Sequence, residues 1–303
     1  MHTQVLGLNS ELKAALAGVI ANVIMGASSL YWKALGDIPP QTLLCYRILI
    51  SLVTIATILA INHDLRSIFN RMSLRLLTVH TLAALFVVIN WGTFIWASIN
   101  GHVLESGLGY LLAPFVAITV GALTLGDKIS LTRLLALITI AVAVSYLFTT
   151  GTDLSHWVYI TIGITWGGYA CFKKLTTLDS FSGLLVESSV LTFFIPLIVL
   201  TMPITLSLPN TISLSKITLL GLCGFVSVIP LALFAFAASR LALSVMGFFQ
   251  FVLPLTQLFV ALAFYRQPVS HSTLICFSVI AISLVLIVAE QFIQGHKLIA
   301  NKI

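Results

Sequence analysis

The sequence predicts an all-α integral membrane protein with ten transmembrane helices arranged as two inverted five-helix repeats. Hydrophobic residues make up 59% of the 303 residues and charged residues only 8%, whereas a soluble domain needs about 25% charged residues to cover its surface. Apolar segments of about 20 residues, the length that crosses ~30 Å of hydrocarbon, follow one another with short links. A repeat at a fixed offset divides the chain into two similar halves.

Ten segments have the length and composition of membrane spans. They cover residues 13–34, 41–62, 76–98, 103–125, 130–149, 156–175, 182–203, 214–239, 242–265 and 270–293. Glu11 and Lys13 precede the first span, which is too long for the core of a signal peptide and carries no A-x-A-like cleavage site, so we interpret it as uncleaved. The links are too short for a soluble domain, and we expect the function to lie within the bundle.

Several function classes are not supported by the residues. The four cysteines fall inside predicted helices at no metal-ligand spacing, and no G-x-x-x-x-G-K-[ST] loop is present. Basic residues form no run that suggests nucleic acid. We therefore expect no metal, no cofactor and no nucleic-acid partner. An intramembrane enzyme or a non-transporting scaffold remains as an alternative of a different class.

Basic residues follow the predicted topology. With the N-terminus inside, eleven of them fall on the cytoplasmic side and four on the outer side, a bias that places both termini in the cytoplasm. The cytoplasmic set is Lys13, Arg66, Arg71, Arg75, Lys128, Arg133, Lys173, Lys174, Arg240, Lys297 and Lys302. The outer set is Lys33, Arg47, Lys216 and Arg266.

One register relates the two halves of the chain, residues 1–150 and 151–303. Pairs 140 residues apart include Pro114 and Pro254, Lys33 and Lys173, Phe94 and Phe234, Gly107 and Gly247, and Ser130 and Ser270. Because each half holds five helices, the second half starts on the opposite side of the membrane, and the repeats are inverted. Such halves can rock about a site at the midplane and give alternating access. The alternative is an inert bundle that inherited a duplication.

Residues 89–125 hold an unusual density of polar and aromatic side chains for two membrane spans. Unpaired polar groups are costly in hydrocarbon, so they tend to face a cavity or a neighbouring helix. We predict that Asn90, Trp91, Phe94 and Tyr110 line a substrate site. For Asn90 an interhelical hydrogen bond is an equally weighted alternative.

The corresponding stretch of the second half contributes Phe249 and Gln250, one amide among aromatic rings, to the same predicted site. An aromatic cluster is more often core than binding site, so the rings alone are weak support. Pro114 lies within a predicted helix, where the loss of one backbone hydrogen bond permits a kink. The candidate hinge residues are Pro114, Pro254, Gly107 and Gly247.

Four charged residues are candidates for gating or coupling. Arg47 and Glu105 lie on the predicted outer side, and we hypothesise that their ion pair closes an outer gate. Glu187 is the repeat counterpart of Arg47, since 187 − 47 = 140. It lies on the inner side, where Lys173 is its expected partner. Glu187 is either a proton carrier or one member of a paired inner gate, and the gate is favoured.

Tyr31 and Trp32 end the first helix. Their place at a helix end, next to Lys33, is typical of an interfacial aromatic belt, and we prefer that interpretation to a place in the substrate site.

Two segments, NWGTFIWASINGHVLESGLGYLLAPF and AASRLALSVMGFFQFVLP, resemble the RarD branch of the EamA group in the drug/metabolite transporter (DMT) superfamily. The resemblance extends over essentially the whole chain, including Tyr46-Arg47 and Leu185-Val186-Glu187. It implies a central cavity lined by the first, third, fourth, sixth, eighth and ninth helices, with the fifth and tenth at the periphery. The chain departs from the family pattern at Arg266-Gln267 and around residues 25–29.

Together these observations predict a bacterial inner-membrane secondary transporter, a multi-pass permease of the EamA type. The resemblance implies a small metabolite, an amino-acid-like compound or an amphipathic drug as substrate, with efflux as the predicted direction. An importer or a facilitator is the alternative within transport. Protons are the candidate coupling ion, and a monomer and a homodimer are both left open.

Overall fold

The computed structural model describes residues 2–62, 65–125, 130–151, 153–201, 204–209, 211–238, 240–241 and 249–300. Within these ranges the chain is helical and forms no strand. The helices are α1 (His2–Ala34), α2 (Pro40–Ile61), α3 (Leu65–Arg71), α4 (Leu74–Asn100), α5 (Val103–Leu125), α6 (Leu131–Thr150), α7 (His156–Lys174), α8 (Ser180–Thr201), α9 (Leu214–Gly221), α10 (Cys223–Ala238), α12 (Val252–Ala263) and α13 (His271–Ala300).

The helices have the dimensions of membrane spans. Among the described residues, seven segments are long and apolar enough to cross a bilayer, in α1, α2, α4, α5, α6, α8 and the combined α9–α10. Shorter apolar stretches lie in α12 and in the first part of α13, and α7 is 19 residues long. The protein is thus an all-α multi-pass membrane protein, as predicted. The count of ten spans remains a prediction.

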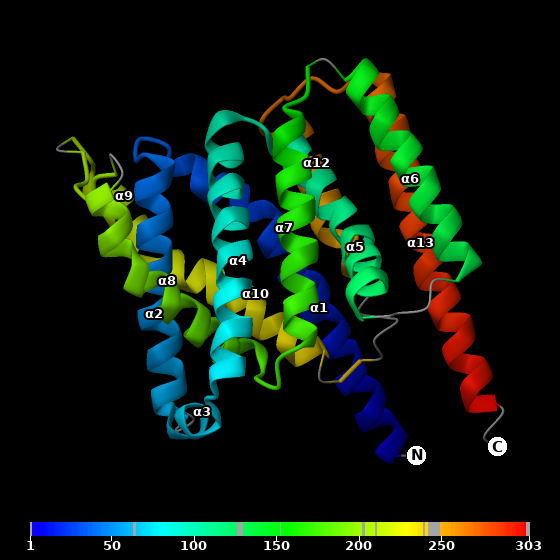
Figure 1. Ribbon diagram of the computed structural model, residues 1–303, viewed down its shortest axis with the longest axis horizontal. Coiled ribbons are helices and arrows are strands. Elements are labelled where there is room, and N and C mark those ends of the chain that lie inside the picture. The colour runs from blue at the N-terminus through cyan, green and yellow to red at the C-terminus, as the bar shows by residue number, and fades with distance from the viewer. Residues whose placement is uncertain are drawn as a thin grey trace.

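Both ends of the described chain lie at the same end of the bundle. In Figure 1, α1 begins and α13 ends at the lower edge, which we call the terminal end. The short helix α3 lies there too, between α2 and α4. The α1–α2, α4–α5 and α6–α7 links lie at the opposite end. This arrangement agrees with the prediction that the two termini share one side of the membrane.

Helix boundaries repeat at the offset found in the sequence. α2 and α8 cover residues 40–61 and 180–201, so both their starts and their ends differ by 140. The starts of α4 and α9, at Leu74 and Leu214, differ by the same number, as do those of α6 and α13, at Leu131 and His271. The agreement supports a division near residue 150, which stays a prediction.

The backbones of helices α5 and α7 approach each other closely because glycines lie at their contact. A Cβ atom built on Gly109 lies 2.6 Å from the Cβ of Ile162, and one built on Gly167 lies 2.6 Å from the carbonyl oxygen of Ala113. Larger residues would push the helices apart. Helices α6 and α13 lie side by side at one edge of the bundle (Figure 1), the peripheral place that the resemblance implies for the fifth and tenth helices.

The two candidate hinge prolines differ in their position along a helix. Pro114 is inside α5, whereas Pro254 is in the first turn of α12, where its missing N–H costs no helical hydrogen bond. A Cβ on Gly107 lies 3.4 Å from the carbonyl oxygen of Pro254, so α5 and α12 touch at this point. Gly247 lies outside the described residues. A hinge role for these residues stays a prediction.

Candidate functional site

A cavity of about 120 Å³ lies inside the bundle. Its described walls come from α1, α2, α4, α5, α7, α8, α10 and α12, so helices from both predicted repeats contribute. Five residues predicted from the sequence line it: Arg47, Asn90, Trp91, Phe94 and Tyr110. The structure therefore brings together the polar and aromatic residues of the central stretch with a charge from α2.

Asn90 ties three helices together at the cavity wall. Its Nδ2 donates to Thr165 Oγ1 at 3.2 Å, and its Oδ1 accepts a hydrogen bond from the hydroxyl of Tyr110 at 3.0 Å. These contacts join α4, α7 and α5. The interhelical hydrogen bond, one of the two alternatives for Asn90, is thus present, and it fixes the orientation of Tyr110 beside the cavity.

Aromatic rings form a continuous wall along the cavity. Ring centroids are 6.0 Å apart for Phe94 and Tyr110, 5.7 Å for Tyr110 and Trp166, and 5.5 Å for Trp166 and Tyr169. All four rings line the cavity. The sequence prediction missed Trp166 and Tyr169 as lining residues, although their spacing of three places them on one face of α7.

Arg47 lines the cavity and forms no ion pair with any acidic residue in the described part of the chain. Its guanidinium carbon lies 4.0 Å from the ring centroid of Trp91 and 5.1 Å from that of Trp32. Its Nε and Nη1 atoms are buried and have no hydrogen-bond partner in the described part of the chain. The expected ion pair with Glu105 is not formed. Trp32 is 1% exposed and lines the cavity, so its prediction as an interfacial belt residue was wrong.

Glu105 belongs to a separate cluster, at the end of the bundle opposite to the terminal end. The carboxylate is buried, lies 2.9 Å from Nδ1 of His102 and accepts a hydrogen bond from the backbone N–H of Ser155 at 3.2 Å. The side-chain amide of Gln267 donates to its second oxygen. Glu105 therefore holds the start of α5 against the α6–α7 and α12–α13 links. The direction of its side chain explains why Arg47 does not reach it.

Glu187 is the centre of a buried polar network near the terminal end. Its side chain is fully buried, and its Oε1 atom lies 3.1 Å from the ammonium of Lys173 and 2.8 Å from Nδ1 of His80. Its Oε2 atom accepts a hydrogen bond from the Tyr169 hydroxyl at 2.9 Å. The expected partnership with Lys173 is confirmed. Because Tyr169 also lines the cavity, the network adjoins the site directly.

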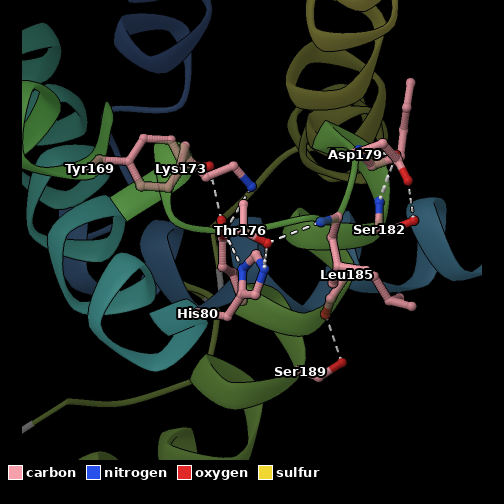
Figure 2. A network of polar contacts seen from close by, with 11 residues as sticks. His80, Tyr169, Lys173, Thr176, Asp179, Ser182, Leu185 and Ser189 are labelled. Atoms are coloured by element: carbon pink, nitrogen blue, oxygen red, sulfur yellow. Dashed lines mark hydrogen bonds and ion pairs between the residues drawn. The ribbon is translucent and has the colours of Figure 1, made fainter. Parts of the chain in front are cut away.

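His80 extends this network towards the α7–α8 link, as Figure 2 shows for His80, Lys173 and Thr176. Its Nε2 lies 2.8 Å from Thr176 Oγ1, which itself accepts a hydrogen bond from the backbone N–H of Leu178. When Nδ1 donates to Glu187 and Nε2 accepts from the Thr176 hydroxyl, both ring nitrogens and the hydroxyl have hydrogen-bond partners.

His80 was not predicted as a site residue, although the sequence contains one hint. It is a lone histidine in the apolar span of α4, with a fully buried side chain. Its partner is 107 residues away in the sequence. We call His80, Tyr169, Lys173, Thr176 and Glu187 the terminal-end network.

Phe249 and Gln250 are not among the described residues that line the cavity. Gln250 is exposed. Phe249 packs against α1, where a Cβ built on Gly18 would lie 2.6 Å from its ring. Their role in a substrate site therefore stays a prediction, and the described lining of this cavity does not include them. The side chains of α12 that do reach the cavity are represented by Leu253.

Known proteins similar to this chain were found by sequence. It is 30% identical over 295 residues to the uncharacterized transporter YojE of Bacillus subtilis, covering 92% of this chain and 94% of that protein. It is 27% identical over 292 residues to protein RarD of Salmonella typhimurium, covering 94% and 97%. Protein RarD of Escherichia coli is 28% identical over 293 residues, with the same coverage. No protein-family model matches the chain.

A comparison of structures agrees with these similarities at the level of the fold. One solved crystal structure superposes with a TM-score of 0.56 at 14% sequence identity and covers 90% of this chain and 96% of its own. The apolar helical bundle and the transporter relatives define the class of this chain as a multi-pass membrane transporter. Its similarity to YojE and to the RarD proteins, over nearly their whole length, shows that it belongs to the RarD-like transporter family.

Proposed function

We propose that this chain is a secondary transporter of the bacterial inner membrane that moves a small solute by alternating access, with export as its direction. The observation that carries the proposal is the cavity inside the bundle, which adjoins a buried polar network at one end. In this proposal the cavity is the solute site, the terminal end faces the cytoplasm, and the terminal-end network is the cytoplasmic gate.

The contacts of the network suit a gate. It links α4, α7 and α8 through His80, Lys173 and Glu187, three helices that must separate to open the terminal end. Glu187 accepts from Tyr169, whose ring forms part of the cavity wall. A solute that displaces this ring therefore changes the contacts of the carboxylate. A buried ion pair of this kind has discrete formed and broken states, as a gate requires.

The opposite end closes by a different kind of contact. Trp32 and Phe94, which line the cavity, belong to an apolar cluster with the buried residues Leu35, Ile38 and Leu43. Apolar contacts of this kind can part and re-form without leaving an uncompensated charge. An inverted pair of halves, rocking about the cavity, would exchange one closure for the other.

Glu187 is also the candidate proton carrier. Protonation of its carboxylate would remove the negative charge that holds Lys173 and would weaken the closed network. A proton bound from the outer side would then favour opening towards the cytoplasm, where it leaves. This step would couple solute movement to the proton gradient, and charge balance within the network is its physical basis.

Flux in proteoliposomes tests the proposal. The purified protein is reconstituted, loaded with a panel of organic acids, amino acids, choline-like amines and chloramphenicol, and followed with and without a pH gradient. We expect solute flux in the wild type that depends on the gradient, and loss of this dependence in Glu187→Gln. Flux that is unchanged by the pH gradient and by Glu187→Gln would indicate a facilitator. Chemical turnover of a solute without flux would contradict transport.

The gate has its own test. Leu184 lines the cavity from α8, so a Leu184→Cys variant in a background without the four native cysteines reports access to the site. A membrane-impermeant thiol reagent added on the cytoplasmic side should label this cysteine faster when Glu187→Gln is also present. Equal labelling rates with and without that change would contradict the gate.

A further inference from the structure

The strongest unassigned feature of the cavity is the charge of Arg47. Every described acid buried in the bundle already has partners: Glu105 contacts His102 and Gln267, and Glu187 contacts Lys173. Arg47 has none, and two of its guanidinium nitrogens are buried without a hydrogen bond. Burying a charge without an opposite charge is strongly unfavourable, so an anion that reached this guanidinium would be stabilised by it.

The surroundings of Arg47 position the guanidinium but do not neutralise it. The indole of Trp91 lies 4.0 Å from the guanidinium carbon, and the indole of Trp32 lies 5.1 Å from it. Such cation–π contacts offset part of the cost of burial and keep the planar group in place. A guanidinium held in this way still presents a fork of N–H donors that matches a carboxylate.

A second unsatisfied group lines the same cavity. The hydroxyl oxygen of Ser227 on α10 is buried and has no hydrogen-bond partner in the described chain. The remaining walls are largely aromatic and aliphatic, represented by Phe94, Trp166 and Leu231. The cavity thus offers one cation, one free hydroxyl and an apolar surface, a combination that orients a ligand with a charged head and an apolar body.

We propose that the solute is a small organic monocarboxylate whose carboxylate pairs with Arg47 and whose apolar part lies against the aromatic wall. The assignment rests on the proposed function and narrows its substrate class. Arg47 is the one cationic residue among the described lining residues, so it balances one negative charge, and a phosphate dianion would leave a charge in excess. No described lining residue is acidic, so the ammonium of an amino acid would have no carboxylate to meet.

Binding to the purified protein in detergent tests the assignment, with the fluorescence of the cavity tryptophans and thermal stabilisation as readouts. The probes are phenylacetate, its neutral amide phenylacetamide, the cation 2-phenylethylamine, zwitterionic phenylalanine and inorganic phosphate. Phenylacetate should bind at least about tenfold more tightly than phenylacetamide, because only the acid forms the charge-assisted pair. Equal affinity for acid and amide, or preference for phosphate, phenylalanine or the amine, overturns the proposal.

Variants locate the effect at Arg47. Arg47→Met keeps an unbranched apolar side chain but removes the charge and the N–H donors, and should reduce phenylacetate binding to the level of the amide. Arg47→Lys keeps the charge without the fork and should give intermediate binding. The matched control is Arg133→Met, because Arg133 lies on α6 near Glu290, outside the described lining. Acid preference that survives Arg47→Met overturns the proposal, and the comparison of acid and amide in the wild type does not depend on how the variants fold.

Flux separates this proposal from the transport proposal. Glu187-dependent movement of neutral or cationic solutes in liposomes, with phenylacetate excluded, would overturn the monocarboxylate assignment and leave transport standing. Arg47-dependent binding of phenylacetate without movement of any solute would support the site and contradict transport.

Discussion

Removing the ammonium of Lys173 is the sharpest test of the terminal-end network. In Lys173→Met the carboxylate of Glu187 stays fully buried and keeps only His80 and Tyr169. Breaking a fully buried ion pair from one side costs about 3–5 kcal/mol. The Lys173 side chain is 19% exposed, so some solvation already weakens the pair. We therefore expect a loss of about 3 kcal/mol in the free energy of unfolding, at the lower end of that range.

The reverse change should cost less. In Glu187→Gln the ammonium of Lys173 is left without its carboxylate, but this side chain can turn towards solvent, so the loss is about 1.5 kcal/mol, the lower value for a hydrogen bond to a charged group. The double variant leaves no uncompensated charge. We expect it to lose about 2 kcal/mol, less than the ~4.5 kcal/mol sum of the single changes, which gives a coupling of about 2.5 kcal/mol.

Reversible unfolding in mixed detergent and SDS micelles measures these values. The control is Lys216→Met, since Lys216 and Asp37 form an exposed pair whose loss should change stability by at most about 1 kcal/mol. Additive costs of the two single variants would refute the argument, because they would mean that Glu187 does not depend on Lys173. If the terminal-end network is the gate, Lys173→Met, Glu187→Gln and the double variant should each also raise the rate at which the Leu184→Cys side chain is labelled.

Two further changes test the elements that hold the site. Asp179 lies just before α8 and accepts hydrogen bonds from the backbone N–H groups of Phe181 and Ser182 and from the Ser182 hydroxyl. Burial raises the pKa of Asp179, but these hydrogen bonds lower it by more, so its pKa is lowered overall. Asp179→Ala should cost about 1 kcal/mol of stability in micelle unfolding; the loss is full above about pH 4 and fades as the pH falls through the lowered pKa of the folded protein, where the wild-type carboxylate becomes protonated. Gly167→Ala should cost about 1–3 kcal/mol in the same assay, because its Cβ meets the carbonyl of Ala113, whereas Gly221→Ala meets nothing and should be neutral or stabilising.

Much of the architecture follows from local properties of the sequence. The length and hydropathy of the apolar segments predicted where helices lie, and the offset of 140 anticipated the matching ranges of α2 and α8. The ion pair of Glu187 with Lys173 was predictable because 14 residues separate them and both lie near the same end. Depth along a helix and charge were sufficient for that inference.

The errors concern the direction of side chains around a helix. Arg47 and Glu105 share one side of the membrane in the prediction, yet one faces the cavity and the other faces the links beyond α5. Trp32 has the sequence context of a belt residue and is nonetheless buried. His80 meets Glu187 across 107 residues. The packing of α1, α4 and α8 decides which helix each side of them contacts. The hydropathy of the sequence does not specify this packing.

Two charges at equivalent positions of the predicted repeat have different surroundings. Arg47 and Glu187 are 140 residues apart, have opposite sign, and lie in α2 and α8, which cover matching ranges. The carboxylate of Glu187 is paired within the protein with the ammonium of Lys173. Arg47 has no such partner among the described residues, and in our proposal its charge binds the solute.

Reversing the sign of the charge at Arg47 should therefore not simply reverse the preference for the solute. Arg47→Glu would place a carboxylate in the cavity without a described cation nearby. We expect loss of phenylacetate binding and no gain of 2-phenylethylamine binding, because the rings of Trp91 and Trp32 favour a cation at this position and not an anion. Binding of 2-phenylethylamine by this variant, at the affinity of the wild type for phenylacetate, would contradict this expectation and show that the sign of the charge alone selects the solute.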